Sequence, residues 1–174
     1  MKNNILYLIF LILFFNSCND ISDAEPVNEE EVISKIVLEI TDLSNNQTQT
    51  YYYQQDVDIP YITLNNNTLY KMNVTFWNYN ESINTEIIEE RNDHFIVYSQ
   101  NNLNILLQRT NEDFVRNDGK KLGIFTQIQT QNPNNGSLEI RLIHLPETVD
   151  DANGFGTVLG GETDVEIAFP VIIQ

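Results

Sequence analysis

From residue 35 onward, apolar side chains recur at every second position, which is the repeat of a β-strand with one buried face. Residues 70–77 show this most clearly, because four alternate residues from Tyr70 to Phe76 are apolar and the residues between them are polar or small. Clusters of Asn, Gly and Pro separate such runs and predict turns. We expect about nine short strands, at residues 35–43, 51–53, 70–77, 84–89, 94–98, 103–107, 122–128, 138–144 and 165–172.

Many short strands with frequent turns are typical of an antiparallel β-sandwich, and we expect an all-β domain of immunoglobulin-like type. No stretch shows the 3.6-residue repeat of an amphipathic helix convincingly. Pro170 lies inside the last expected strand and cannot donate a ladder hydrogen bond, which predicts a sheet edge or a bulge at that point. The 174 residues fit one domain of this class.

The charge balance and the motifs that the chain lacks narrow the possible functions. The chain has 25 acidic and 9 basic residues, a formal net charge of −16, which argues against nucleic acid as a partner. The single cysteine, Cys18, excludes an intramolecular disulfide and a thiolate zinc cluster. The sequence contains no nucleophile elbow, no phosphate-binding glycine loop and no His-Glu-x-x-His motif, so we expect no enzyme activity.

The first 18 residues differ from everything that follows. Lys2 precedes eleven uninterrupted apolar residues, 5–15, a run too short for a helix that crosses a bilayer and typical of a secretory signal. The stretch Phe15-Asn16-Ser17-Cys18 resembles a bacterial lipoprotein signal, in which the cysteine is acylated and becomes the mature N-terminus. We therefore expect residues 1–17 to be removed and lipid on Cys18 to anchor the protein in the outer membrane.

Residues 18–34 are predicted to form an acidic tether between the lipid and a β-sandwich domain at residues 35–174. The tether contains six acidic residues and no basic one. Without residues 1–17 the chain has 8 basic and 25 acidic residues, a net charge of −17, which keeps the domain away from anionic lipid surfaces. Acidic residues directly after the cysteine also resemble the surface-export signals of Bacteroidetes lipoproteins, so both a periplasmic and a cell-surface location stay open.

Four stretches resemble one family of proteins. They are residues 93–95 (Asp-His-Phe), residues 122–126, residues 136–146 and residues 160–169. Together they are similar to small flavobacterial lipoproteins often labelled "type 1 periplasmic binding fold". That label implies a two-lobed α/β receptor, which a chain this short and rich in strands cannot form. Members of the family resemble accessory proteins of TonB-dependent uptake, and this resemblance implies capture of a scarce nutrient rather than catalysis.

The two histidines are the first candidates for chemistry. His94 and His144 lie within the family-like stretches, each at the end of an expected strand. If the imidazoles converge, Glu162 or Asp164 would add a carboxylate oxygen, and this donor set suits zinc, copper or iron, including haem iron. Each histidine also shares the parity of the apolar residues in its strand. The alternative is therefore a pair of core imidazoles that are hydrogen-bonded to backbone carbonyl groups.

Two other features suggest ligands. Trp77 and Tyr79 would stack on sugar rings if their own rings are exposed, whereas the alternative places these rings in the core. The stretch from Asp150 to Gly154 offers side-chain oxygens beside a glycine turn, as calcium loops do. It lacks the spacing of an EF-hand, so we expect a solvated acidic loop.

These features predict a lipid-anchored outer-membrane protein that binds a metal or another small ligand. The family resemblance implies that it assists a TonB-dependent transporter in nutrient uptake. The alternative is a carbohydrate- or protein-binding surface module without a metal.

Overall fold

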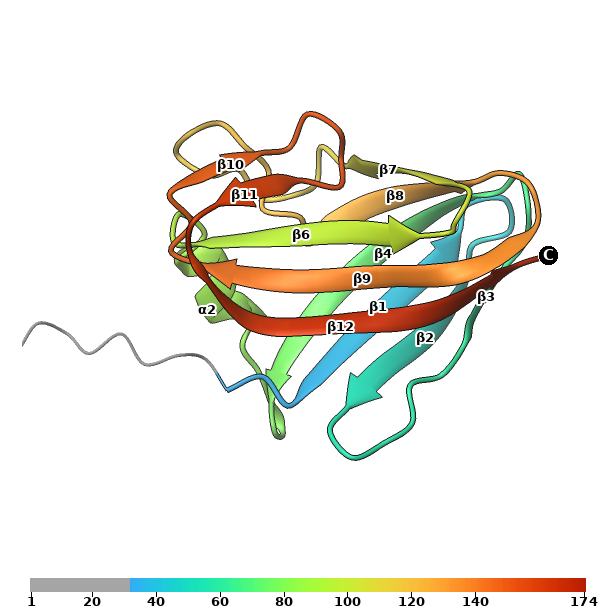
Figure 1. Cartoon of the computed structure of the whole chain (residues 1–174), viewed down its shortest axis with the longest axis horizontal. Coiled ribbons are helices and arrows are strands. Elements are labelled where there is room, and N and C mark those ends of the chain that lie inside the picture. The colour runs from blue at the N-terminus through green and yellow to red at the C-terminus, as the bar shows by residue number, and fades with distance from the viewer. Residues whose placement is uncertain (1–31) are drawn as a thin grey trace, which may run out of the picture.

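Twelve strands and one short helix form the part of the chain that the computed structural model describes, residues 32–174. Their bounds are β1 (Lys35–Asp42), β2 (Gln47–Gln54), β3 (Ile62–Leu64), β4 (Leu69–Asn78), β5 (Glu81–Ser82), α2 (Asn84–Glu89), β6 (His94–Asn101), β7 (Ile105–Arg109), β8 (Phe125–Thr130), β9 (Asn134–His144), β10 (Thr148–Asp150), β11 (Thr157–Leu159) and β12 (Glu162–Ile173). They build an all-β sandwich, which confirms the predicted fold class (Figure 1).

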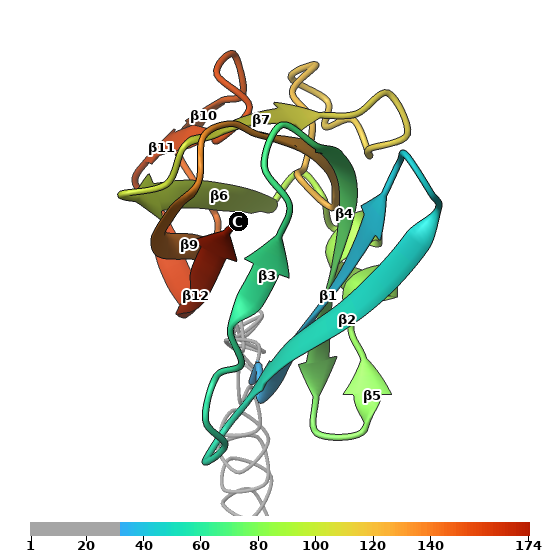
Figure 2. The same ribbon diagram turned by 90° about the vertical axis from the view of Figure 1, so that its right-hand side faces the viewer.

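The sandwich consists of two sheets. The first has the strand order β2-β1-β4-β8-β7, with β5 added to β4, and the second has the order β3-β12-β9-β6. Figure 2 shows the second sheet on the left and β1, β2 and β4 of the first on the right. Neighbouring strands are antiparallel except β3 and β12, which run parallel. The immunoglobulin-like connectivity stays a prediction.

Period-two alternation builds the core between the sheets. In the first sheet, Ile36 lies opposite Phe76 and Leu38 lies opposite Val74 in the antiparallel register of β1 and β4. All four side chains are fully buried, and the residues between them face outward or are half-buried. The second sheet contributes the alternate apolar residues of β9 and β12 to the same cluster. Burial of these two faces against each other is the main source of stability.

Strand β6 is buried on both of its faces. Ile96 and Tyr98 point into the main core, while Phe95 and Val97 pack with Ile143 in a second, smaller cluster. The hairpin formed by β10 and β11 lies over this second cluster, as Figure 1 shows. A five-residue run of buried residues therefore replaces the usual alternation at the start of β6.

The number of strands is twelve rather than about nine. The strands missing from the sequence prediction are β3, β5, β10 and β11, each of two or three residues. A run this short cannot show a period of two. Pro170, which cannot donate a ladder hydrogen bond, lies just before the residues of β12 that pair with β3. Because β3 pairs only with residues 171–173, no donor is needed from Pro170 on that side.

The prediction of a strand at residues 84–89 is wrong, because these residues form helix α2. The Asn84 side chain hydrogen-bonds to the backbone of β4. Its amide oxygen accepts from Phe76 N, and its amide nitrogen donates to Val74 O. The helix then buries Ile87 against the core. Six residues are too few to display a helical repeat, so the sequence pattern could not distinguish the two states.

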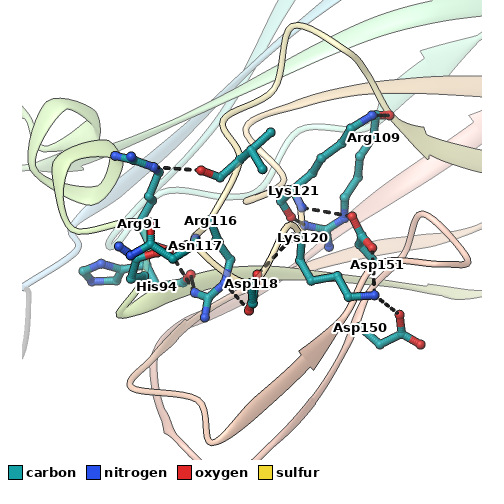
Figure 3. Close-up of polar contacts among 12 residues, drawn as sticks. Arg91, His94, Arg109, Arg116, Asn117, Asp118, Lys120, Lys121, Asp150 and Asp151 are labelled. Carbon is teal, nitrogen blue, oxygen red and sulfur yellow. Dashed lines mark hydrogen bonds and ion pairs between the residues drawn. The ribbon is translucent and has the colours of Figure 1, made fainter.

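A buried arginine joins β6, β7 and two loops. Arg109 is 7% exposed, and its guanidinium donates to the carbonyl oxygens of Gly154 and Lys121 at 3.0 and 2.7 Å and to that of Ile96. Its central carbon lies 4.3 Å from the centroid of the Phe95 ring. Figure 3 shows this side chain beside Lys121 and Asp151. The planar guanidinium of Arg109 thus donates to several backbone carbonyl groups at once.

Replacing Arg109 with lysine should therefore destabilise the fold. A lysine keeps the charge but cannot reach these carbonyl oxygens together, which leaves buried polar groups without hydrogen bonds. We expect a loss of about 3–5 kcal/mol in the free energy of unfolding, measured by urea denaturation. The matched control is Arg141→Lys, at a side chain 31% exposed, where we expect a change within about 0.5–1 kcal/mol. Equal losses in both variants would contradict this role for Arg109.

Candidate metal centre

The two histidines lie directly opposite each other at the end of the second sheet. His94 is the first residue of β6 and His144 is the last residue of β9, and the antiparallel register pairs them. Their rings are stacked, with centroids 4.8 Å apart and planes inclined by 5°. The two imidazoles therefore lie side by side, and both residues are buried, at 0% and 5% exposure.

A β-bulge brings Asp164 to this pair. Thr163 pairs with Ile143 and Val165 pairs with Leu142, so Asp164 is an extra residue with no counterpart on β9. Bulges of this kind redirect a side chain and strengthen the local twist. The Asp164 side chain is 1% exposed, and its Oδ1 lies 3.9 Å from His144 Nδ1.

The carboxylate in the group is Asp164 and not Glu162. Potential ligand atoms of His94, His144 and Asp164 all lie within 4.8 Å of one another, and Glu162 is outside this group. Glu162 pairs with His144 in the ladder, but it is the first residue of β12 and its side chain is exposed to solvent.

The turns on both sides of the site have constrained backbones. Leu145 follows His144 with a left-handed φ of 48°, which is rare for a branched residue, and its N–H donates to Asp93 O at 2.6 Å. Gly161 precedes β12 with a φ of 84°, and a Cβ atom there would lie 2.7 Å from the His144 carbonyl oxygen. Only glycine fits this close approach, so the backbone geometry holds the ends of β6, β9 and β12 together.

Contacts with the backbone hold His94 in place. Its Nδ1 lies 3.2 Å from the carbonyl oxygen of Glu90, the C-cap residue that follows α2. Because a carbonyl oxygen only accepts, Nδ1 carries the proton of a neutral His94 and Nε2 carries the lone pair. The guanidinium of Arg116 donates to the carbonyl oxygens of His94 and Arg91 (Figure 3). Sequence reasoning did not identify Arg116, because no periodic pattern links it to His94.

Negative charge lies close to this end of the molecule. A groove of about 460 Å³ beside α2 is lined by Glu81, Glu86, Glu89 and Glu90. Burial lowers the pKa of His94, an effect that the Glu90 carbonyl and the Asp93 and Glu86 carboxylates partly oppose. The acidic side chains therefore favour a cation at this end of the sheet.

The other predicted ligand residues lie elsewhere. Tyr79 is 72% exposed in the turn between β4 and β5, whereas Trp77 is half-buried and packs against the ammonium group of Lys35 at 5.1 Å. The stretch from Asp150 to Gly154 is largely exposed, with only Gly154 buried. Lys120 forms ion pairs with Asp150 and Asp151 at 3.0 and 3.5 Å (Figure 3). Cys18 lies outside the described residues.

No helix within residues 32–174 is long and apolar enough to cross a membrane. The signal, the lipidated cysteine and most of the tether, residues 1–31, also lie outside the described residues, so the structure leaves the expected anchor as a prediction.

Burial of His94 predicts that the metal-free protein loses stability as the pH falls. An unfolded histidine titrates at about pH 6.5, while the pKa of folded His94 is lower. The unfolded chain therefore binds the proton first, so the stabilising effect is complete above about pH 6.5 and is lost as the pH falls toward the folded-state pKa. We expect the urea midpoint to fall between pH 7.5 and 5.5, and His94→Gln to remove part of this slope. Identical slopes in both proteins would contradict the assignment.

Comparisons with known proteins assign no function to this site. No protein-family model, no curated protein and no solved structure matches the chain. The resemblance to small flavobacterial lipoproteins therefore stays a prediction.

Proposed function

We propose that this chain is a metal-binding module whose centre is formed by His94, His144 and Asp164. One observation carries the proposal: two imidazoles and a carboxylate from three adjacent strands have ligand atoms within 4.8 Å of one another. All three side chains are buried. A divalent cation between the three groups would have two imidazole nitrogens and one carboxylate oxygen as ligands.

The donor set favours a first-row transition metal. Two imidazole nitrogens and one carboxylate oxygen suit zinc best, and they also suit copper and iron. Calcium and magnesium prefer oxygen ligands only. A single ion fits this group better than haem, because a porphyrin needs open space beside the imidazole that binds its iron.

Ion binding requires a small rearrangement. Ligand atoms around tetrahedral zinc are about 3.3–3.5 Å apart, given bond lengths of about 2.0–2.1 Å. The imidazoles of His94 and His144 lie nearly parallel, so both rings have to tilt about their Cβ–Cγ bonds until their lone pairs converge. The proton on His94 Nδ1 already favours Nε2 as the ligand atom, since Nδ1 faces the Glu90 carbonyl.

Three protein ligands leave a fourth coordination position for water or an exchanging group. Structural zinc sites are closed by four protein ligands, whereas sites with three keep an exchangeable position. Such a site suits an ion that is captured and passed on. We propose that lipid on Cys18 anchors the module in the outer membrane and that a TonB-dependent transporter receives the metal.

The metal proposal is tested by titrating the chelator-stripped protein with Zn²⁺, Cu²⁺ and Co²⁺ in a calorimeter. We expect one ion per chain with a dissociation constant of about 1 µM or tighter for zinc. His94→Ala and His144→Ala should each weaken binding at least about 100-fold, because each removes a direct ligand. Asp164→Asn should also weaken it, because the amide is uncharged.

The matched control is Glu162→Gln, which removes an exposed carboxylate two residues from Asp164. We expect this variant to bind zinc as the unmodified protein does. Urea denaturation of every variant separates a lost ligand from a lost fold. Tight zinc binding that survives both histidine substitutions together, or the absence of any binding below about 100 µM, would overturn the proposal.

The proposed anchor is tested separately with Cys18→Ser in a bacterial host that processes lipoproteins. We expect the variant to incorporate no fatty acid and to partition into the aqueous phase of a detergent extraction, because a serine carries no thioether-linked lipid. The unmodified protein should incorporate labelled palmitate and enter the detergent phase. Detergent partitioning that does not depend on Cys18 would contradict lipid anchoring.

A further inference from the structure

A second site is suggested by a groove at one end of the first sheet. Three segments meet there: β1 begins at Lys35, β2 ends at Gln54, and the turn of Tyr79 and Asn80 joins β4 to β5. The groove has a volume of about 330 Å³, within the usual range for small-ligand sites. None of the three proposed metal ligands lines it.

Tyr79 has an unusual backbone conformation for its residue type. Its φ of 49° lies in the left-handed region, where four of the six non-glycine residues in the described chain are Asn or Asp. The Ser34 hydroxyl oxygen accepts the Tyr79 N–H at 2.6 Å and fixes the turn. The strain does not serve core packing, because the Tyr79 side chain is largely exposed beside the groove. Strained residues of this kind cluster at functional sites.

The other groove walls are polar but nearly neutral. Gln54, Gln55 and Asn80 offer amide groups, each with donors and an acceptor. Lys35 and Asp56 contribute one positive and one negative charge. The groove is therefore nearly neutral, although the whole chain has a net charge of −16. Balanced charge favours an uncharged ligand, and the amide groups favour one that is rich in hydroxyl groups.

Two aromatic rings contact Lys35, one of the residues that line the groove. The Lys35 ammonium group lies 5.6 Å from the centroid of the Tyr52 ring and 5.1 Å from that of Trp77. These cation–π contacts hold the lysine in place, which reduces the entropy lost when a ligand binds. Trp77 therefore acts on this groove through Lys35, while Tyr79 presents its own ring to solvent.

We propose that this groove binds a neutral oligosaccharide and that Tyr79 is its stacking platform. The C–H groups on one face of a sugar ring carry partial positive charge and pack against the negative face of an aromatic ring. Neighbouring sugar hydroxyls match the paired donor and acceptor of the amide side chains. The ring of Tyr79 has only two rotatable side-chain bonds, so little entropy is lost when a sugar orders it.

The test is a calorimetric titration of the full protein with maltohexaose, cellohexaose, xylohexaose and laminarihexaose. We expect saturable binding of at least one of them with a dissociation constant of about 1 mM or tighter. Tyr79→Ala should weaken that binding at least about 10-fold, and Tyr79→Phe should leave it within about 3-fold, because phenylalanine keeps the stacking face. The matched control is Tyr61→Ala, at a tyrosine that is 64% exposed and does not line the groove.

Two further measurements separate this site from a merely structural turn and from the metal centre. Tyr79→Asn should weaken sugar binding as much as Tyr79→Ala does, while keeping or raising the melting temperature, by up to about 2–4 °C, because asparagine tolerates a left-handed φ. Chelator and the His94→Ala variant should leave sugar binding unchanged. Absence of saturable binding to all four sugars at 10 mM, or binding that survives Tyr79→Ala, would overturn the proposal.

Discussion

The register between β6 and β9 is the constraint on which both the core and the candidate metal centre depend. Eight pairs run without interruption from His94 and His144 to Asn101 and Ser137. The alternation that buries Ile96 in the core therefore also brings both imidazoles to the core side of the sheet. A slip of one residue would reverse the faces of β6 and separate the histidines. Burial of the apolar residues of β6 and β9 thus also fixes the positions of the two imidazoles.

Burial on both faces of β6 creates a second requirement, because loops packed against it cannot satisfy their polar groups with water. Charged side chains supply the hydrogen-bond partners that water cannot. Arg109 and Arg116 donate to backbone carbonyl groups, and the carboxylate of Asp113 accepts the N–H groups of Gly123 and Ile124 at 2.7 and 2.9 Å. These charged side chains form their hydrogen bonds with backbone groups. The loops beside His94 are therefore held by hydrogen bonds between charged side chains and the backbone.

The sequence predicts the long strands and the two histidines as candidate residues, since both follow from parity. Parity places His94 and His144 with buried neighbours at strand ends, but it leaves open whether the two imidazoles converge, because only the pairing of β6 with β9 brings them together. The choice of Asp164 over Glu162 does not follow from parity, because a bulge between Thr163 and Val165 changes which side chain faces inward. The contact of Arg116 with the His94 carbonyl, 22 residues apart in the chain, likewise leaves no periodic signal.

The bulge in β12 has an evolutionary consequence. The extra residue is absorbed between two intact pairs, so the strand on either side keeps its register whatever side chain stands at position 164. A change of the proposed third ligand at this position therefore removes no ladder pair between β12 and β9. Strand β12 combines a part that packs the interior, from Phe169 to Ile173, with a bulge at which evolution can exchange a side chain without losing a ladder pair.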